Sequence, residues 1–262
     1  MKNKLCKRVN LFFSSFFIFL LHLPFVFAKS KAGTSGEVKP AVIAVAKTSA
    51  SSTPPIEITN NNVVTNLYDS LRLNTLGLAK NVFEYAMAGF NSMKEMGTLM
   101  NTSIISIADF SKPSSKKRLF VIDLKNCKVL FNTYVAHGMN SGREFANQFS
   151  NTPESNKSSL GFYSTLNTYE GKHGYSLHLQ GVERGINDNA YRRDIVMHAA
   201  DYVSESFINN QGYLGRSQGC PAIPERLHKP IIDKIKNGTC FFIFGQDKRY
   251  LTRSRLLSGL HA

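Results

Sequence analysis

Residues 118–136 read RLFVIDLKNCKVLFNTYVA, and this stretch indicates the fold class of a chain of 262 residues. It holds two short runs, 118–124 and 128–136, that are rich in β-branched and aromatic residues. Runs of this length and composition, interrupted by polar residues, are typical of β-strands. The stretch therefore predicts two successive strands.

The same pattern recurs on both sides of this stretch. Short β-branched or aromatic runs, separated by Gly, Pro, Asn and Ser, occupy 104–110, 160–166, 176–182, 194–198 and 240–244. So many short strands predict a mostly β domain over residues 101–250. Either a sandwich or an open barrel with a few peripheral helices fits this pattern.

Helical periodicity precedes the β runs. Apolar residues recur at helical spacing over 64–71 and again over 79–93, and Gly97 follows as a stop signal. We expect residues 61–100 to be a helical segment that packs on the β domain.

A further helix is expected near the C-terminus. Pro230 fits the first position of a helix, and Asn237 with Gly238 would end it. Residues 251–262 are expected to form a C-terminal tail.

The first 28 residues have the composition of a secretory signal peptide. Four basic residues come first, an apolar run follows over 11–27, and Ala28 is a small residue at a cleavage position. An uncleaved membrane anchor is the alternative, because the apolar run is near the shortest that can span a bilayer. Residues 29–60, rich in Ala, Ser, Thr, Lys and Pro, are expected to be a disordered linker. We therefore expect export to the periplasm or cell wall, with the membrane contacted only through the signal peptide.

The chain is basic, with 32 Lys and Arg against 18 Asp and Glu, a formal net charge of +14. Cleavage after residue 28 would remove four basic residues and leave 28 against 18, or +10. A basic protein suits either nucleic acid or an anionic cell envelope. Because no basic cluster is interleaved with aromatic residues, a nucleic-acid partner is not expected.

Residues 215–224 read GRSQGCPAIP and contain the cysteine best suited to catalysis. Cys220 lies between a glycine and a proline, so its thiol is expected on a turn. A nucleophilic cysteine needs a proton acceptor and free backbone N–H groups, which Ser217, Gly219 and Cys220 could supply. His198, at the end of an apolar run, is the candidate base. We expect a mildly acidic Cys220 thiol that His198 deprotonates.

The sequence resembles the active-site signature of the L,D-transpeptidases in His198-Ala199-Ala200, a spacer and Ser217-x-Gly219-Cys220. These cysteine enzymes cross-link peptidoglycan outside the bacterial membrane. Further motifs follow the family's order: FVIDL (120–124), VAHG (135–138), SG (141–142), TP (152–153) and LGFY (160–163). The resemblance covers roughly residues 104–246 and is nearest to a variant branch in which Pro-Ala-x-Pro follows the cysteine.

The resemblance implies a substrate and a reaction. The Cys220 thiolate would attack a peptidoglycan stem peptide, release a terminal D-alanine and pass the acyl group to an amine of a second stem. His198 would act as base and acid, and the Ala199 carbonyl or the Asp201 carboxylate would orient its ring. Gly219 would supply an oxyanion N–H. No cofactor or metal is implied, and the protein is expected to be a monomer.

Substrate contacts are expected from Arg216, Gln218, Tyr175 and His178. Arg216 is next to the cysteine motif, and a guanidinium binds a carboxylate through two parallel hydrogen bonds. Gln218 stands where the commonest family pattern has a histidine. The remaining candidates are Arg143, Tyr191 and Tyr213, for which surface charge or core packing is the alternative.

Three cysteines follow the signal peptide: Cys127, Cys220 and Cys240. Exported chains favour disulfides, and three thiols allow one bridge. If a bridge forms, we expect it between Cys127 and Cys240, because catalysis requires a free Cys220. The histidines lack the paired spacing of common zinc motifs, so no metal site is expected.

Three other functions remain open on sequence alone. An L,D-carboxypeptidase or cysteine peptidase on the same fold would resolve the thioester with water. A non-catalytic wall-binding module would keep the fold without the chemistry, and a metal-dependent hydrolase would not need Cys220.

Overall fold

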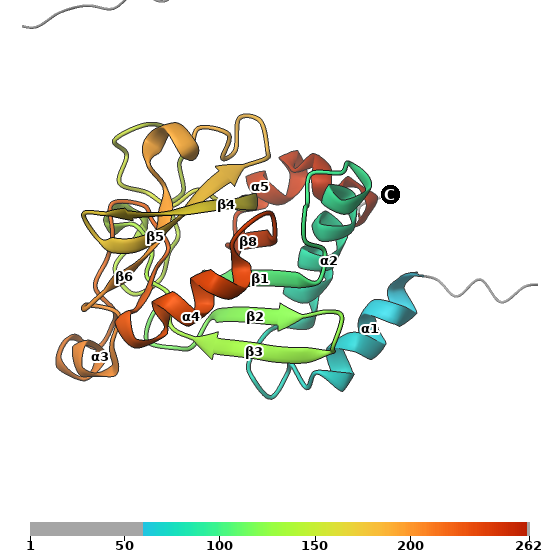
Figure 1. Cartoon of the computed structure of the whole chain (residues 1–262), viewed down its shortest axis with the longest axis horizontal. Helices are drawn as coiled ribbons and strands as arrows, with labels where there is room; N and C mark the ends of the chain where they lie inside the picture. The colour runs from blue at the N-terminus through green and yellow to red at the C-terminus, as the bar shows by residue number, and fades with distance from the viewer. Residues whose placement is uncertain (1–59, 261–262) are drawn as a thin grey trace, which may run out of the picture. The chain divides into compact units, whose positions relative to one another are not determined.

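The computed structural model describes residues 60–260 of the chain. Apart from Asn60, the expected signal peptide (1–28) and linker (29–60) lie outside the described residues. The described part is built on one mixed sheet of eight strands with helices around it (Figure 1). The prediction of a mostly β domain is confirmed.

The sheet combines parallel and antiparallel pairs. Its strands are β1 (Ile104–Asp109), β2 (Leu119–Asp123), β3 (Lys128–Thr133), β4 (Gly161–Gly171), β5 (Gly174–Gly181), β6 (Val196–Ala200), β7 (Ala222–Pro224) and β8 (Cys240–Phe244). Their spatial order is β3-β2-β1-β8-β4-β5-β6-β7. The pairs β1·β8 and β6·β7 run parallel, and the other neighbours run antiparallel. Seven strands match the predicted runs, and β7 was not predicted.

The sheet curls into an open barrel rather than a two-sheet sandwich. β3 and β7 are the two ends of the strand order. The chain that leaves β3 reaches β7, where the Ala136 amide donates a hydrogen bond of 2.8 Å to the Ala222 carbonyl. This bridge brings the two ends of the sheet together at the segment that carries Cys220.

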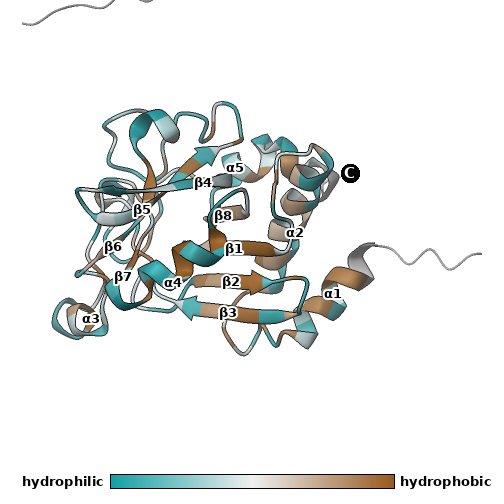
Figure 2. Ribbon diagram, viewed as in Figure 1, coloured by the Kyte–Doolittle hydropathy of each residue, from teal (hydrophilic) through white to brown (hydrophobic). Residues whose placement is uncertain are grey.

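The hydrophobic core lies along β1, β2 and β8, whose residues are buried almost end to end. In Figure 2 the ribbons of β1 and β2 are mostly coloured as hydrophobic. The Phe162 ring of β4 stacks on Phe242 with ring centroids 4.2 Å apart. Burial of such apolar surface, at about 25 cal/mol per Å², is the main stabilising contribution.

Helices surround the sheet: α1 (Asn60–Ser70), α2 (Lys80–Glu95), α3 (Glu205–Gln211), α4 (Glu225–Ile235) and α5 (Lys248–Arg253). Short 3₁₀ turns cover Met139–Ser141, Tyr191–Arg193 and Arg255–Leu260. The two N-terminal helices agree with the predicted ones, and α2 packs on β1 and β8. It approaches the sheet closely at Gly89, where the Phe162 ring leaves no room for a side chain.

The predicted start of the helix near the C-terminus, at Pro230, is wrong. α4 begins at Glu225, and Pro230 lies inside it. An internal proline removes one backbone hydrogen bond of the helix. Burial of Ile231, Ile232 and Ile235 offsets that loss. The helix ends where it was predicted to, before Asn237 and Gly238, which both have positive φ angles.

Residues 251–260 are ordered on the domain rather than forming a tail. They continue α5 and form the last 3₁₀ turn, in which Leu256 and Leu257 are buried. The Ser92 hydroxyl of α2 donates a hydrogen bond of 3.3 Å to the Leu256 carbonyl. The C-terminal turn therefore covers α2.

The expected bridge between Cys127 and Cys240 is absent, because both cysteines are free. Cys127 is exposed in the turn between β2 and β3. Cys240 is buried at the start of β8, with its Sγ 3.7 Å from the Sδ of Met93. Cys220 is also free, as a nucleophile must be.

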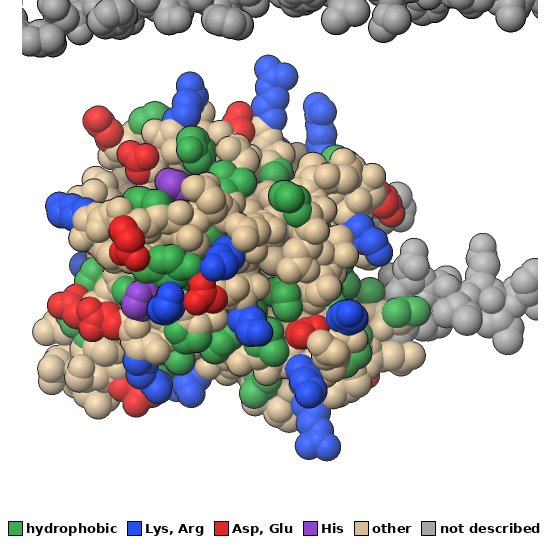
Figure 3. Space-filling model, in the orientation of Figure 1, with side chains coloured by type: hydrophobic (Ala, Val, Ile, Leu, Met, Phe, Trp, Pro, Cys, Tyr) green, Lys and Arg blue, Asp and Glu red, His purple; other side chains and the backbone are tan. Residues whose placement is uncertain are grey.

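Charged side chains are mixed over the surface. Figure 3 shows Lys and Arg interspersed with Asp and Glu on the face in view. None of the helices within residues 60–260 is long and apolar enough to cross a membrane.

A buried Arg118–His137 pair lies behind the Cys220 segment. The Arg118 guanidinium is fully buried and donates to the carbonyls of Val135 and Lys112 and, over 2.8 Å, to His137 Nδ1. Because Nδ1 accepts, the proton of the neutral ring is on Nε2, which donates to the Gly142 carbonyl at 3.2 Å. Burial and the Arg118 charge lower the pKa of His137 to about 3.

This low pKa predicts a loss of stability in acid. Below its ordinary pKa of 6.5, His137 is protonated in the unfolded chain but stays neutral in the fold until about pH 3. Its contribution to the free energy of unfolding should therefore fall by about 2 kcal/mol between pH 7 and pH 5. Urea unfolding of the wild type and of His137→Gln at both pH values measures this difference.

The comparison of the two proteins isolates His137 from other titrating groups. Burial raises the pKa values of Asp109 and Glu183, which act in the opposite direction in both proteins. Equal pH slopes for the wild type and the variant would contradict a neutral buried His137.

Candidate active site

The turn before Cys220 is held by its own side chain and by the segment after β3. The Ser217 amide donates to the His137 carbonyl at 3.0 Å, and the Met139 amide donates to the Ser217 carbonyl at 2.8 Å. The Ser217 hydroxyl accepts from the Gly219 amide at 3.0 Å and donates to the Cys220 carbonyl at 2.6 Å. Gly219 has a φ of +125°, a conformation that favours glycine. These constraints fix the turn that presents the thiol.

Cys220 lies beside β6. The parallel pairing of β6 with β7 sets His198 opposite Ala222, two residues after Cys220. The Val196 amide donates to Cys220 Sγ at 3.5 Å, and the thiol donates to the Asp194 carbonyl at 3.5 Å. Cys220 and His198 both line a cleft of about 910 Å³. Strand register thus brings together the two residues that the sequence singled out.

The His198 ring is oriented by a backbone carbonyl. Its Nδ1 is 2.8 Å from the carbonyl oxygen of Ala199, so Nδ1 carries the proton of the neutral ring. Nε2 is then the basic nitrogen. Burial lowers the pKa of His198, and the neighbouring His173 adds to that effect. The ring is therefore neutral near pH 7 and able to accept a proton.

The expectation of a mildly acidic thiol is wrong for this structure. Burial raises the pKa of Cys220, while the Val196 amide and the Arg193 charge oppose that rise. The resting group is therefore a thiol, and formation of the thiolate requires a base. His198, which lines the same cleft, is the candidate for that base.

His173 is a site residue that the sequence reasoning did not place. It lies in the turn between β4 and β5, where Gly174 has a φ of +69°. Its ring stacks on His198 with centroids 4.3 Å apart and planes 24° apart. Nothing in the sequence except the residue type pointed to His173, because its contact with His198 joins a hairpin turn to a strand that is distant in sequence.

Arg193 was also missed. Its guanidinium donates to the carbonyls of Ser150 and Lys157 at 2.8 and 2.7 Å, and it lines the cleft. It is near enough to Cys220 to lower the thiol pKa. The next residue, Asp194, adopts a left-handed conformation with φ +53°, which turns the chain into β6.

Of the arginines and the glutamine that were expected near the substrate, some line the cleft and one does not. Arg216 and Gln218 line the cleft, whereas Arg143 is not among its lining residues. Both arginines lie over the Tyr213 ring, at 5.7 Å for Arg216 and 4.9 Å for Arg143. Tyr213 therefore supports Arg216 from outside the cleft.

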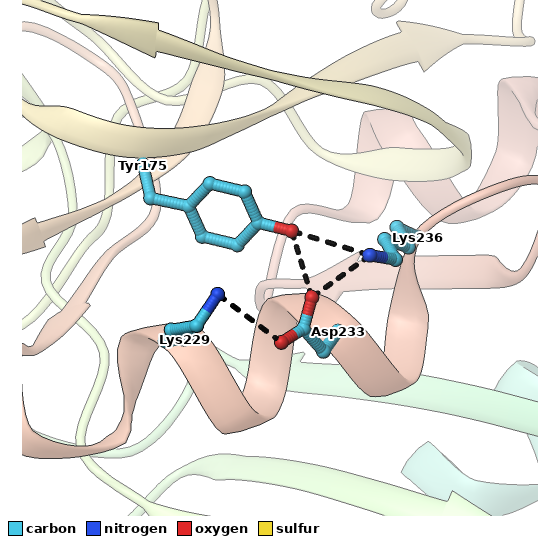
Figure 4. Close-up of polar contacts among 4 residues, drawn as sticks. All are labelled: Tyr175, Lys229, Asp233 and Lys236. Carbon is cyan, nitrogen blue, oxygen red and sulfur yellow. Dashed lines mark hydrogen bonds and ion pairs between the residues drawn. The ribbon is translucent and has the colours of Figure 1, made fainter.

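The Tyr175 side chain points toward Asp233 and Lys236 at α4 (Figure 4). Its hydroxyl donates to Asp233 of α4 at 2.7 Å, and Lys236 donates to that hydroxyl at 3.3 Å. The ammonium of Lys229 lies over the ring at 4.6 Å. Tyr175 thus ties β5 to α4, and it is not among the residues that line the cleft.

His178 lies behind the cleft wall. Its ring stacks on Tyr169, with centroids 4.3 Å apart, and lies 5.6 Å from the Tyr191 ring. Tyr169 lines the cleft, and His178 does not. His178 therefore lies next to a residue that lines the cleft rather than in the cleft itself.

The cleft holds side chains suited to nucleophilic chemistry. Within residues 60–260, no three His, Cys, Asp or Glu side chains are grouped as ligands of a metal ion. Cys220 and a neutral His198 line one cleft, and a thiol paired with an imidazole base is the arrangement used for acyl transfer.

Comparison with known proteins gives a family match. Residues 74–244 match the family model described as L,D-transpeptidase catalytic domain. This match includes α2 and ends with β8. No curated protein matches the chain.

Several solved structures are distantly similar. An L,D-transpeptidase from Mycobacterium smegmatis is 13% identical, with a TM-score of 0.34, over 55% of this chain and 59% of that one. An L,D-transpeptidase from Xylanimonas cellulosilytica is 12% identical, with a TM-score of 0.33, over 70% and 93%. A helical cell shape determining protein from Campylobacter jejuni is 12% identical, with a TM-score of 0.39, over 68% and 62%. The chain thus spans about three fifths of the Mycobacterium smegmatis chain.

The stacked His173 ring predicts a measurable change at His198. In His173→Ala, water gains access to the His198 ring and the electrostatic effect of His173 is lost, so the pKa of His198 should rise toward 6.5. NMR titration of labelled imidazoles measures this pKa without any substrate.

His228→Ala, which changes a histidine on α4, is the matched control and should leave the His198 titration in place. An unchanged His198 pKa in His173→Ala would show that the stacking does not affect the base.

Proposed function

Because the chain belongs to the L,D-transpeptidase catalytic domain family, we propose that it cross-links peptidoglycan stem peptides with Cys220 as nucleophile and His198 as base. The family acts outside the cytoplasm on such stem peptides. One observation carries the proposal for this chain: Cys220 and His198, whose Nδ1 is paired with the Ala199 carbonyl, line the same cleft.

The first half-reaction forms a thioester. His198 Nε2 takes the proton of Cys220, and the thiolate adds to the carbonyl carbon of the donor stem peptide. The tetrahedral intermediate then breaks its C–N bond, and His198 returns the proton to the departing D-alanine amine. Because burial raises the pKa of Cys220, the thiol is the resting form and His198 has to remove its proton for the thiolate to attack.

The second half-reaction transfers the acyl group. An amine of a second stem attacks the thioester carbon and gives its proton to His198. The C–S bond breaks, and Cys220 recovers its proton as the new amide is released. Water in place of the amine gives the carboxypeptidase reaction with the same residues.

The oxyanion of each intermediate requires N–H donors that are not already paired. The Gly219 amide donates to Ser217 in this structure, so it is engaged in holding the turn. The Cys220 amide has no acceptor among the hydrogen bonds of residues 60–260. We therefore assign the oxyanion contact to the Cys220 amide, with Gly219 and Ser217 shaping the turn.

The cleft charge suits an anionic peptide. Its lining includes Lys172, Arg192, Arg193 and Arg216 against Glu154 and Asp194. Stem peptides carry several carboxylates, and guanidinium groups bind carboxylates in two-bond pairs. Arg216, which is stacked on Tyr213 and donates to the Gly142 carbonyl at 3.4 Å, is held ready for such a pair.

The protein should act after export. A basic start, an apolar run and Ala28 support a signal peptide. The three thiols that follow it are free in this structure, so the domain does not depend on a disulfide.

Acylation by a carbapenem tests the nucleophile. A β-lactam reacts with an activated thiolate by ring opening, so intact-protein mass spectrometry of the wild type should show an adduct of the drug's mass. Peptide mapping should place it on Cys220. Cys220→Ser should form no adduct, whereas Cys127→Ser should react as the wild type does. An adduct that survives in Cys220→Ser would refute the assignment.

A defined tetrapeptide muropeptide tests the reaction. The wild type should yield a cross-linked dimer and free D-alanine, and His198→Gln should be slower by about 10²–10⁴-fold, the usual worth of a general base. Liquid chromatography with mass spectrometry separates the products. A tripeptide product without dimer would identify a carboxypeptidase instead.

A further inference from the structure

A buried serine from a distant loop contacts the peptide bond that precedes the nucleophile. The Ser158 hydroxyl donates to the Gly219 carbonyl at 3.2 Å and accepts from the Gly138 amide at 3.0 Å. Ser158 is 1% exposed, and 61 residues separate it from Gly219. The polar loop 150–159 gave no sign of this contact in the sequence.

The Gly219 carbonyl and the Cys220 amide belong to the same peptide group. A trans peptide is planar, so its C=O and N–H point in opposite directions. No cis peptide bond occurs among the described residues. Because Ser158 bonds to the Gly219 carbonyl on the buried side, the Cys220 N–H points in the opposite direction within the peptide plane, away from Ser158.

The surroundings of Ser158 leave it little freedom. Its own amide donates to the hydroxyl of Ser141, which is fully buried, at 2.9 Å. A Cβ added at Gly138 would lie 2.9 Å from both Ser158 N and Gly219 Cα. Three backbone segments are therefore packed in direct contact at this point.

We propose that Ser158 is a positioning residue, which aims the Cys220 N–H at the substrate carbonyl oxygen by fixing the Gly219–Cys220 peptide plane. The inference rests on the proposed function, since it concerns the oxyanion formed when the Cys220 thiolate attacks. In this proposal Cys220 has two separate roles: its Sγ atom reacts with the substrate, and its backbone amide, which Ser158 orients, binds the oxyanion.

Two reagents separate these properties. A carbapenem is attacked at its lactam carbonyl: the S–C bond forms, the oxygen becomes an oxyanion, and the C–N bond then breaks with protonation of the nitrogen. Iodoacetamide is attacked at its methylene carbon: the S–C bond forms and iodide leaves. Only the first reaction places a new negative charge on an oxygen, so only the first should depend on the direction of the Cys220 amide.

The test compares both rates in the full-length wild type and in Ser158→Ala. Peptide mapping by mass spectrometry separates modification at Cys220 from modification at the exposed Cys127. In Ser158→Ala, carbapenem acylation should slow at least tenfold, toward the roughly 10²–10³-fold loss seen when a whole oxyanion donor is removed. Alkylation of Cys220 by iodoacetamide should stay near the wild-type rate.

Two further variants control for packing. Ser158→Thr keeps the hydroxyl and should acylate faster than Ser158→Ala. Ser114→Ala removes another buried serine hydroxyl, which accepts from the Leu214 amide at 3.2 Å, and should leave both rates unchanged. Thermal unfolding of each variant reports whether it is folded.

The outcomes are distinct. Acylation of Ser158→Ala at the wild-type rate, or an equal loss of both rates, would overturn the role of Ser158. A wild type that is alkylated at Cys220 but forms no carbapenem adduct would overturn the proposed function itself.

Discussion

The parallel pairing of β6 with β7 is the interaction on which the site depends. It involves only three pairs of residues, from His198 with Ala222 to Ala200 with Pro224. Yet it sets the imidazole on one strand next to the turn that carries the thiol on the other. A shift of one residue would turn His198 to the opposite face of the sheet, because side chains alternate along a strand.

Such a short pairing needs support from outside. On one side, Ala136 bonds to Ala222 and Ser217 bonds to His137, which is itself held by the buried Arg118. On the other, β5 pairs with β6 at Leu177 and His178. The turn that carries Cys220 is thus held by segments that are far apart in the chain, and each uses backbone groups that must be paired when buried.

The sequence predicted the strands and helices whose own residues are strongly apolar or periodic. The runs around Phe120 and Phe242 are strongly apolar, so their strand character was evident before any pairing was known. β7 was missed because it is three residues long and ends in a proline, and only its contact with β6 makes it a strand. Pro230 was misplaced as a helix start because the apolar face of α4 outweighs the cost of an internal proline.

The same distinction holds for the site. Cys220 was predicted because a glycine and a proline flank it, and His198 because it ends an apolar run; both also match the family's signature, and the structure places both in one cleft. His173, Arg193 and Ser158 were not predicted, because each acts through a contact between turns or loops distant in sequence. Tyr175 had the right residue type but faces α4, since the direction of a strand side chain depends on which side of the sheet a helix covers.

The bridge between Ala136 and Ala222 also bears on how copies of the protein meet one another. An exposed sheet edge is a template for pairing with another chain and a common origin of aggregation. Here one end of the strand order is occupied by the protein's own backbone at Ala222, and the other, β3, begins with the exposed Lys128. The bridge at Ala222 and the exposed Lys128 of β3 therefore both act against pairing with a second copy at these two ends of the sheet.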